Sequence, residues 1–279
     1  MILLTWNLNS RTNNIKEQLD AITKYKADVL AFQEVTMGSL GKLKEYLPEM
    51  GYKNILESFS LSKEKKKPTG KRKYGQIIAS KYKLKKRSPE KFNVPWRERI
   101  LSADILTDKG KIEIHTTHIP PGASNGTIKI EMLEGIFKKL NRKTKKLRIL
   151  CGDFNTPQFE LEDGTIVTWG QIVKYTGLTT GDLRRDLKIS KSKDSDWDKG
   201  ERDIFEKLKN KNLIDVYRHL HGYKKKDHSW RTHGERKTGR RFDHIFASEE
   251  LNVIECKYDH KVRERGLSDH SAMVAEFDI

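Results

Sequence analysis

The chain has 279 residues, with 56 Lys and Arg against 39 Asp and Glu, which gives a formal net charge of +17 at pH 7. This excess of positive charge favours a polyanionic partner, with nucleic acid ahead of an anionic membrane surface. Two cysteines are too few to indicate a disulfide framework, and no apolar run approaches the roughly eighteen residues of a membrane span.

The first residues, MILLTWNLN, are apolar only as far as Trp6, and no basic segment precedes them. This pattern argues against a secretory signal. The sparse use of cysteine suits a reducing compartment, because disulfide-rich proteins belong to oxidising ones. We therefore expect a cytoplasmic protein.

The opening of the chain alternates strand, helix and strand. Residues 2–4 predict a buried strand, and apolar residues at helical spacing over 15–25 predict a helix. Asn13 or Asn14 can cap that helix, and residues 29–32 predict the next strand. This order is typical of a layered α/β architecture.

The centre of the chain contains a predicted hairpin, with strands over 100–106 and 112–117 joined by a turn at 107–110. A hairpin in this position makes the sheet mixed rather than wholly parallel. Apolar patterns also predict strands over 77–79, 147–151, 242–247 and 273–277, and helices around 133–140 and 204–208.

A single domain over 1–279 is the simplest organisation, because the chain has no internal repeat and no Pro/Gly/Ser-rich linker. Two segments interrupt the regular pattern. Residues 62–73 form a basic segment that we interpret as a solvated loop. Residues 158–199 show little periodicity, which predicts an irregular insertion.

A second basic segment, 224–241, contains Trp230 among eight basic residues. An aromatic side chain in such a loop can stack on a base while its neighbours hold phosphates. Alternatively, Trp230 packs beneath the sheet, and the sequence does not decide between the two. The residues assigned to nucleic acid are Trp230, Arg231, Arg240 and Arg241.

Small polar groups follow or precede most of the predicted strands, in the segments TWNLN, FQE, HTTHIPPG, CGDFN, RFDHIFAS and GLSDH. Polar residues gathered at one edge of a sheet form a site on a rigid scaffold. The residues expected at this edge are Asn7, Asn9, Glu34, His118, Asp153, Asn155, Asp243, Asp269 and His270.

Taken singly, these residues have ordinary structural explanations. CGDFN suits a turn, Glu34 a surface carboxylate and His118 a loop histidine. Taken together, carboxylate and amide oxygens suit Mg²⁺, and two imidazoles can carry a proton or bind phosphate. No Cys/His spacing indicates structural zinc, so an oxygen-ligated divalent ion is preferred.

Six motifs in this order, TWNLN, AFQE, THIPPG, CGDFN, RFDHIFAS and GLSDH, resemble the endonuclease/exonuclease/phosphatase superfamily, which includes DNase I and exonuclease III. Each motif is weak alone, but six in register from Asn7 to His270 are specific. The resemblance implies a DNase I-like α/β fold, called α+β in some schemes, in which two packed mixed sheets are flanked by helices in four layers. It also implies Mg²⁺, or alternatively Mn²⁺, and hydrolysis of a phosphoester by in-line attack of water.

The resemblance assigns the metal and the water to particular residues. Glu34 would be the main metal ligand, and Asn7 and Asp269 would support the ion or the phosphate. Asp153 would orient and deprotonate the attacking water. Asn155 would hold that carboxylate and a phosphate oxygen.

The two imidazoles, His118 and His270, would donate to phosphate oxygens as charge builds in the transition state. A carboxylate beside a buried imidazole stabilises its cation. By resemblance Asp243 would pair with His270, and Glu98 of VPWRERI would pair with His118. Asn9 would lie behind the ligands.

Asp269 and His270 are adjacent, and in a regular strand adjacent side chains point to opposite faces. Both can serve one site only if the backbone bends before the last strand begins. Gly266 offers such a bend, and the hydroxyl of Ser268 can brace it. We expect Asp269 to face the metal and His270 the scissile phosphate.

The substrate class is less constrained. Family members specialised for abasic sites usually carry a tyrosine at the position of His118, so the histidine favours a DNase I-like or end-processing phosphodiesterase. The charge favours DNA, in a monomer without an obligate protein partner. The alternatives are a tyrosyl-DNA-type phosphodiesterase, an RNase, a phosphoinositide or sphingomyelin phosphoesterase, and lastly a nucleic-acid binder without turnover.

Overall fold

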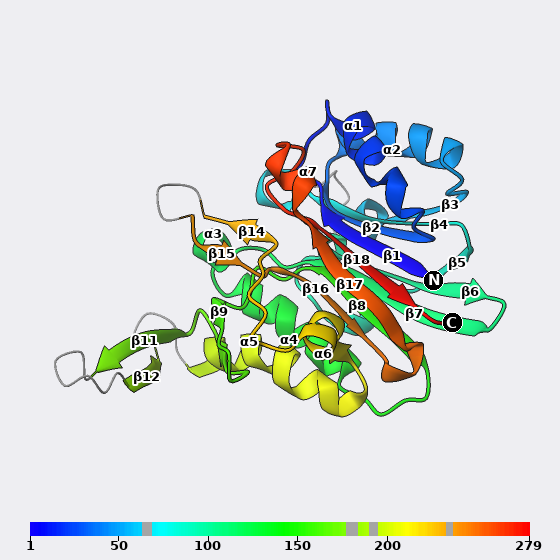
Figure 1. Ribbon diagram of the computed structural model, residues 1–279. Helices are drawn as coiled ribbons and strands as arrows, with labels where there is room; N and C mark the ends of the chain where they lie inside the picture. The colour runs from blue at the N-terminus through cyan, green and yellow to red at the C-terminus, as the bar shows by residue number, and fades with distance from the viewer. Residues whose placement is uncertain (63–68, 177–183, 190–194, 233–236) are drawn as a thin grey trace.

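Two six-stranded mixed sheets form the centre of the molecule (Figure 1). The computed structural model describes residues 1–62, 69–176, 184–189, 195–232 and 237–279. Helices cover the outer face of each sheet, so the layers are helix, sheet, sheet, helix. This arrangement confirms the predicted four-layered α/β sandwich.

The first sheet contains, from one edge to the other, β17 (Val253–Asp259), β18 (Ala272–Phe277), β1 (Ile2–Asn7), β2 (Val29–Val35), β4 (Gly75–Ser80) and β3 (Asn54–Glu57). β1 and β2 run parallel, and the other neighbours run antiparallel.

The second sheet contains β13 (Ile214–Asp215), β16 (Asp243–Ala247), β8 (Leu147–Asp153), β7 (Gly110–His118), β6 (Ile100–Thr107) and β5 (Lys83–Lys86). Here β7 and β8 are the parallel pair. The hairpin of β6 and β7 confirms the prediction of a mixed sheet.

The longer helices cover the two outer faces. They are α1 (Ile15–Ile22) and α2 (Met37–Glu49) on the first sheet, and α4 (Ile128–Leu140) and α5 (Ser195–Lys207) on the second. The shorter helices are α3 (Gly122–Asn125), α6 (Val216–His221) and α7 (His260–Glu264). The 3-10 turns are η1 (Thr23–Tyr25), η2 (Phe59–Leu61), η3 (Gly70–Arg72), η4 (Pro89–Phe92), η5 (Arg97–Arg99), η6 (Leu208–Lys211) and η7 (Glu249–Leu251). No helix in the described ranges is both long and apolar enough to cross a membrane.

The central strands are buried on both faces, which explains why they are continuous apolar runs in the sequence. Successive side chains of β1 alternate: Leu3 packs in the cluster between the two sheets, and Leu4 packs in the cluster under α1 and α2. In β2, Ala31 and Phe32 divide in the same way. Burial on both faces fixes the register, because a shift of one residue would exchange the two clusters.

Residues 158–199 are more regular than predicted. They contain the hairpin of β9 (Phe159–Glu160) with β10 (Ile166–Val167), the hairpin of β11 (Gln171–Thr176) with β12 (Arg184–Ile189), and the start of α5. The hairpin of β11 and β12 extends away from the sandwich (Figure 1), so its strands need no apolar face and give no strand pattern in the sequence. In the basic loop over 62–73, residues 63–68 lie outside the described ranges, and η3 follows.

Candidate active site

Strand ends at one edge of the two sheets bring the predicted residues together. Asn7 ends β1, Glu34 lies near the end of β2, and His118 ends β7. Asp153 ends β8 opposite His118, and Asp243 begins the antiparallel β16 opposite Asp153. Parallel strands that end at one edge, and an antiparallel strand that begins there, place these side chains in one site.

Glu34 has a left-handed backbone with φ 52°. The ladder between β2 and β4 is irregular here, between Phe32 and Val35. Such a backbone costs about 1 kcal/mol or more in a non-glycine residue and is often found at functional sites. The carboxylate accepts hydrogen bonds from Asn7 Nδ2 and Ser10 Oγ, both at 3.3 Å. Burial raises the pKa of Glu34.

Asp153 is the most heavily hydrogen-bonded carboxylate of the site. Its Oδ1 accepts from the backbone N of Asn155 at 2.9 Å, and its Oδ2 accepts from Asn7 Nδ2 at 2.9 Å and Asn155 Nδ2 at 3.3 Å. Burial raises the pKa of Asp153 to about 7; nearby His270 lowers it in part, and the charge of Asp243 raises it further. A carboxylate with this pKa can accept a proton at neutral pH.

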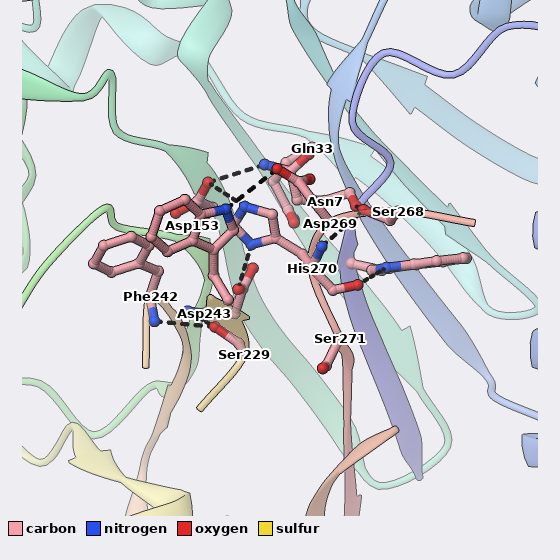
Figure 2. Close-up of polar contacts among 12 residues, drawn as sticks. Asn7, Gln33, Asp153, Ser229, Phe242, Asp243, Ser268, Asp269, His270 and Ser271 are labelled. Atoms are coloured by element: carbon pink, nitrogen blue, oxygen red, sulfur yellow. Dashed lines mark hydrogen bonds and ion pairs between the residues drawn. The ribbon is translucent and has the colours of Figure 1, made fainter. Parts of the chain in front are cut away.

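His270 forms the predicted pair with Asp243 (Figure 2), with Nδ1 at 2.7 Å from Oδ2. The opposite ring nitrogen, Nε2, lies 3.8 Å from Asp153 Oδ2. Burial alone would lower the pKa of His270, but the charges of Asp243 and Asp153 outweigh it and raise the pKa to about 10. The imidazole is therefore a cation at neutral pH.

The stretch GLSDH is bent before β18, as predicted. Gly266 has φ 71°. The Ser268 hydroxyl donates to the carbonyl of Asn7 at 2.6 Å and accepts from the backbone N of His270 at 3.1 Å. The regular strand begins only at Ala272. Asp269 and His270 thus escape the alternation of a strand and line one cavity.

His118 has a different partner from the predicted one. The Glu98 carboxylate binds Arg72, with Oε1 at 2.6 Å from Nε and Oε2 at 2.8 Å from Nη2. Nδ1 of His118 instead contacts Nη1 of Arg99. The prediction of Glu98 as the partner of His118 is therefore wrong: in η5 the carboxylate and the guanidinium of successive residues have separate partners.

The contact with Arg99 fixes the protonation of His118. A guanidinium only donates, so Nδ1 accepts and the ring hydrogen of neutral His118 lies on Nε2. Burial, followed by the positive charges of Arg99 and His270, lowers the pKa of His118 well below its usual value. Nε2 lies 3.5 Å from Glu34 Oε1 and 3.7 Å from Asp153 Oδ2. His118 is therefore a neutral donor, whereas His270 is a cation.

One cluster of donors suits a divalent ion. Carboxylate oxygens of Glu34 and Asp153 and a ring nitrogen of His118 lie within 4.8 Å of one another. The two carboxylates are the ligands this cluster offers, because His118 accepts from Arg99 at Nδ1 and keeps its hydrogen on Nε2. Burial raises the pKa of both carboxylates, which shows that the pocket disfavours their negative charge unless a proton or a cation compensates it. A cation with a preference for oxygen ligands fits this demand.

Two other predicted ligands have different contacts. Asn7 donates its amide to Glu34 and Asp153, and its Oδ1 accepts from the backbone N of Asn9 at 2.9 Å, so it braces the carboxylates. Asp269 lines the cavity outside the cluster, and its Oδ2 accepts from Trp230 Nε1 at 3.2 Å.

A cavity of about 400 Å³ opens on Glu34, Asp153 and His270. Trp169, Trp230 and Phe242 give it an aromatic lining. Trp230 also stacks on Phe242, with ring centroids 5.3 Å apart. Trp230 is therefore held by packing against Phe242 and also lines the cavity. Its stacking on a base stays a prediction.

The assigned arginines differ in their surroundings. Arg241 is buried and bound to Glu160 and Asp215, so its assignment to nucleic acid is wrong. Its ion pairs join the segment just before β16 to Glu160 of β9 and Asp215 of β13, a contact that residue order alone does not reveal. Arg240 is partly buried over the ring of Phe159, and Arg231 is exposed.

A buried ion pair that the sequence did not suggest supports Asn155 from behind. Lys129 Nζ contacts Glu201 Oε1 and donates to the carbonyl of Asn155 at 2.9 Å. Trp169 Nε1 donates to the same carbonyl at 3.2 Å, and its backbone N donates to Glu201 Oε2 at 2.7 Å. Lys129 and Glu201 stand among many charged residues of α4 and α5, so no local signal distinguishes them.

We expect Lys129→Met to lower the free energy of unfolding by about 3–5 kcal/mol, because it leaves the Glu201 charge buried without its partner. Adding Glu201→Gln should recover part of the melting temperature. The rate constant kcat of the double variant should remain about tenfold low, because the Asn155 carbonyl has lost the Lys129 donor and keeps only Trp169 Nε1. Thermal melts and steady-state kinetics check this, and a wild-type kcat in the double variant would limit the pair to a structural role.

The comparisons with known proteins agree with this geometry. A model of the endonuclease/exonuclease/phosphatase family matches residues 4–270. An AP endonuclease from Archaeoglobus fulgidus shares the fold with a TM-score of 0.70 at 20% identity, over 100% of both chains. A 3' phosphatase, NExo from Neisseria, in a structure bound to a product DNA hairpin, has a TM-score of 0.69 and a sequence identity of 18%, over 100% of both chains. A humanized TDP2 from D. rerio has a TM-score of 0.64 and a sequence identity of 15%, over 100% of this chain and 99% of that one. A search among curated proteins gave no match.

Identities of 20% or less show a common fold and no more. The family match is broader evidence, because it extends from β1 to His270 and includes every strand end of the site. Its members hydrolyse phosphoester bonds. This chain belongs to the endonuclease/exonuclease/phosphatase family.

Proposed function

We propose that the protein is a divalent-metal-dependent phosphodiesterase that cleaves DNA with little sequence specificity. The observation that carries the proposal is the position of His270, a cation held by Asp243, beside Asp153 and the ligand cluster. This arrangement offers an anionic base and a cationic donor side by side, as hydrolysis of a phosphodiester requires.

Asp153 acts on the attacking water. Its carboxylate is fixed at both oxygens by Asn7 and Asn155, so it can orient a water molecule and take its proton. Asn155 has a left-handed backbone with φ 51° and donates Nδ2 to the Ile119 carbonyl, which holds it beside Asp153. The pair aligns the water for in-line attack.

The two imidazoles act on the phosphate. His270 offers an N–H and a positive charge to a phosphate oxygen on which negative charge grows in the transition state. His118 offers a neutral N–H from Nε2. Because these donors are fixed before the substrate binds, they need little reorganisation during the reaction.

Glu34 would be the main ligand of the divalent ion, with Asp153 next to it to orient the water, and Mg²⁺ is the first choice because carboxylates are hard oxygen ligands. Mn²⁺ is the alternative. Such an ion neutralises the anionic phosphate so that water can approach. His118 keeps its hydrogen on Nε2 and faces the phosphate as a donor.

Bound Mg²⁺ should stabilise the fold more at pH 8 than at pH 5.5. The pKa of Asp153 is about 7 in the folded protein, so at pH 5.5 a proton occupies the carboxylate and competes with the ion. Differential scanning fluorimetry with and without saturating Mg²⁺ measures the shift in Tm at each pH. An equal shift at both pH values would place the ion away from Asp153.

DNA is the proposed substrate because of charge and fold. Binding to a polyanion releases counterions, and a net charge of +17 favours it. The similar structures named as an AP endonuclease and a 3' phosphatase bound to a DNA hairpin support the same class. Contacts to phosphates carry no sequence information, which is the reason to expect low specificity.

A panel of labelled single-stranded, double-stranded, abasic and 3'-blocked DNA, with RNA alongside, tests the proposal. Cleavage of DNA with Mg²⁺ and none with EDTA is the expected result. Cleavage that survives EDTA would refute the metal site. Activity on soluble phosphoinositides and none on DNA would refute DNA as the substrate and favour a lipid-headgroup phosphoesterase.

The aromatic cavity favours one second candidate, a DNA end-processing phosphodiesterase of the tyrosyl-DNA type. Trp169, Trp230 and Phe242 could pack against an aromatic group attached to a DNA end. Release of a tyrosine analogue from a 5' or 3' end, faster than internal cleavage, would support this candidate. A nucleic-acid binder without turnover is least favoured, since the catalytic set is complete.

We further propose that residues 1–279 act as one domain, as a cytoplasmic monomer without an obligate protein partner. All the site residues described above come from one pair of packed sheets and their loops. Sedimentation of the purified chain tests the oligomeric state.

A further inference from the structure

Two arginines converge on one nitrogen of His228, beside the catalytic cavity. Arg231 Nε lies 2.5 Å from His228 Nε2, and Arg263 Nη2 lies 3.0 Å from the same atom. Both guanidinium groups can only donate, so Nε2 must accept. Burial, followed by the charges of Arg263 and Arg231, lowers the pKa of His228 to about 4, which agrees with a neutral ring.

The imidazole ring of His228 is held in place by the ring of His260. His228 stacks on His260, with centroids 5.3 Å apart and planes 14° apart. His260 in turn has Nε2 at 3.0 Å from Asp227 Oδ1 and Nδ1 at 2.9 Å from Ser271 Oγ. Asp227 accepts from Tyr217 Oη at 2.5 Å. Packing and hydrogen bonds around His228 and His260 therefore fix the acceptor to which the two guanidinium groups bind.

The charges of Arg231 and Arg263 are not neutralised by a directly bound carboxylate in the part of the chain that the structure describes. Within the described ranges, neither Arg231 nor Arg263 forms an ion pair with Asp or Glu at 4.0 Å or less. Glu264, Asp227 and Asp243 act on Arg263 only as nearby charges. Two like charges on one neutral acceptor repel each other, so an anion between them would be stabilising.

The arginine pair is adjacent to the catalytic loop. Arg263 Nη1 donates to the Ser229 carbonyl at 3.2 Å, and Ser271, the neighbour of His270, donates its backbone N to the same carbonyl at 2.8 Å. Trp230 lies between Ser229 and Arg231 in the chain and faces the cavity. In Figure 1, β14 (Trp230–Arg231) and α7 carry the two arginines near the same end of the sandwich.

We propose that Arg231 and Arg263 form a binding site for one backbone phosphate of the nucleic acid, next to the phosphate that is cleaved. The inference rests on the proposed function and deepens it. The planar forks of two arginines match the oxygens of a phosphate, and His228 keeps them at a fixed spacing. The site would set the position of the strand relative to Asp153 and His270 without reading its sequence.

The test compares Arg231→Gln, Arg263→Gln and the double variant with Arg265→Gln. Arg265 is exposed directly after α7 and is not among the residues that donate to His228 Nε2, so this control removes the same single charge as each single variant. On a labelled oligonucleotide, the double variant should raise KM about tenfold and keep kcat within about twofold. The slope of log KM against log salt should fall by about 1. Hydrolysis of bis(p-nitrophenyl) phosphate, which is too small to reach the pair, should not change.

An equal rise in KM for Arg265→Gln, an unchanged salt slope, or a loss of activity on the small substrate would overturn the site. Binding of the same oligonucleotide in EDTA, followed by fluorescence anisotropy, separates this inference from the proposed function. Arginine-dependent binding without any cleavage would refute the nuclease and support the phosphate site. Cleavage with no arginine dependence in either assay would refute the site alone.

Discussion

Asp153→Asn is expected to lower kcat on DNA at least about a hundredfold, or roughly 2.7 kcal/mol of transition-state stabilisation. Asparagine cannot take a proton from water, although it has nearly the shape of the aspartate. It also replaces one acceptor oxygen with a donor, where Asn7, Asn155 and the imidazoles all present hydrogen-bond donors. The rate under saturating Mg²⁺ and substrate measures the loss.

Asp20→Asn is a matched control, because it removes the same charge from an exposed position on α1. It should leave kcat unchanged. Circular dichroism and a cooperative melt check that Asp153→Asn still folds. A folded Asp153→Asn variant with kcat within a few fold of wild type would remove Asp153 from the chemistry.

Asp243→Asn is expected to move the alkaline limb of the pH–rate profile toward neutral pH. The folded pKa of His270 is about 10, above its usual value, so the cation persists until the pH rises through 10. Without the charge of Asp243 that pKa falls, and the cation is lost at lower pH. The variant should therefore lose most of its activity at pH 9, where wild type retains it, and less at pH 6.

The profile of kcat/KM between pH 5 and 10.5 measures this shift. Asp20→Asn again serves as the control, with an unchanged alkaline limb. A uniform loss at every pH, without movement of the limb, would mean that Asp243 holds the ring of His270 in position but does not set its charge.

The fold could be predicted from the sequence because the strands buried on both faces are apolar runs. The runs at 29–32 and 147–151 correspond to β2 and β8. Segments whose pattern is weaker were not predicted. α2 has only four buried residues among polar ones, and β17 pairs along one side with β18 while much of it stays exposed.

Much of the site could also be predicted, because strand ends carry its main residues. The pair of Asp243 with His270 is confirmed. The surroundings of Glu98 and Arg241 could not be predicted, since they depend on which distant charge reaches each side chain. Lys129 and Glu201 are 72 residues apart and meet only through the packing of α4 on α5.

The most direct test of the account is single-turnover cleavage of labelled DNA across a Mg²⁺ titration, after EDTA and dialysis, with wild type and Glu34→Gln. We expect no cleavage without the ion, recovery when it is added, and at least a tenfold higher Mg²⁺ requirement for Glu34→Gln. Cleavage without a divalent ion, or the same requirement in both proteins, would contradict a metal site at Glu34 beside Asp153.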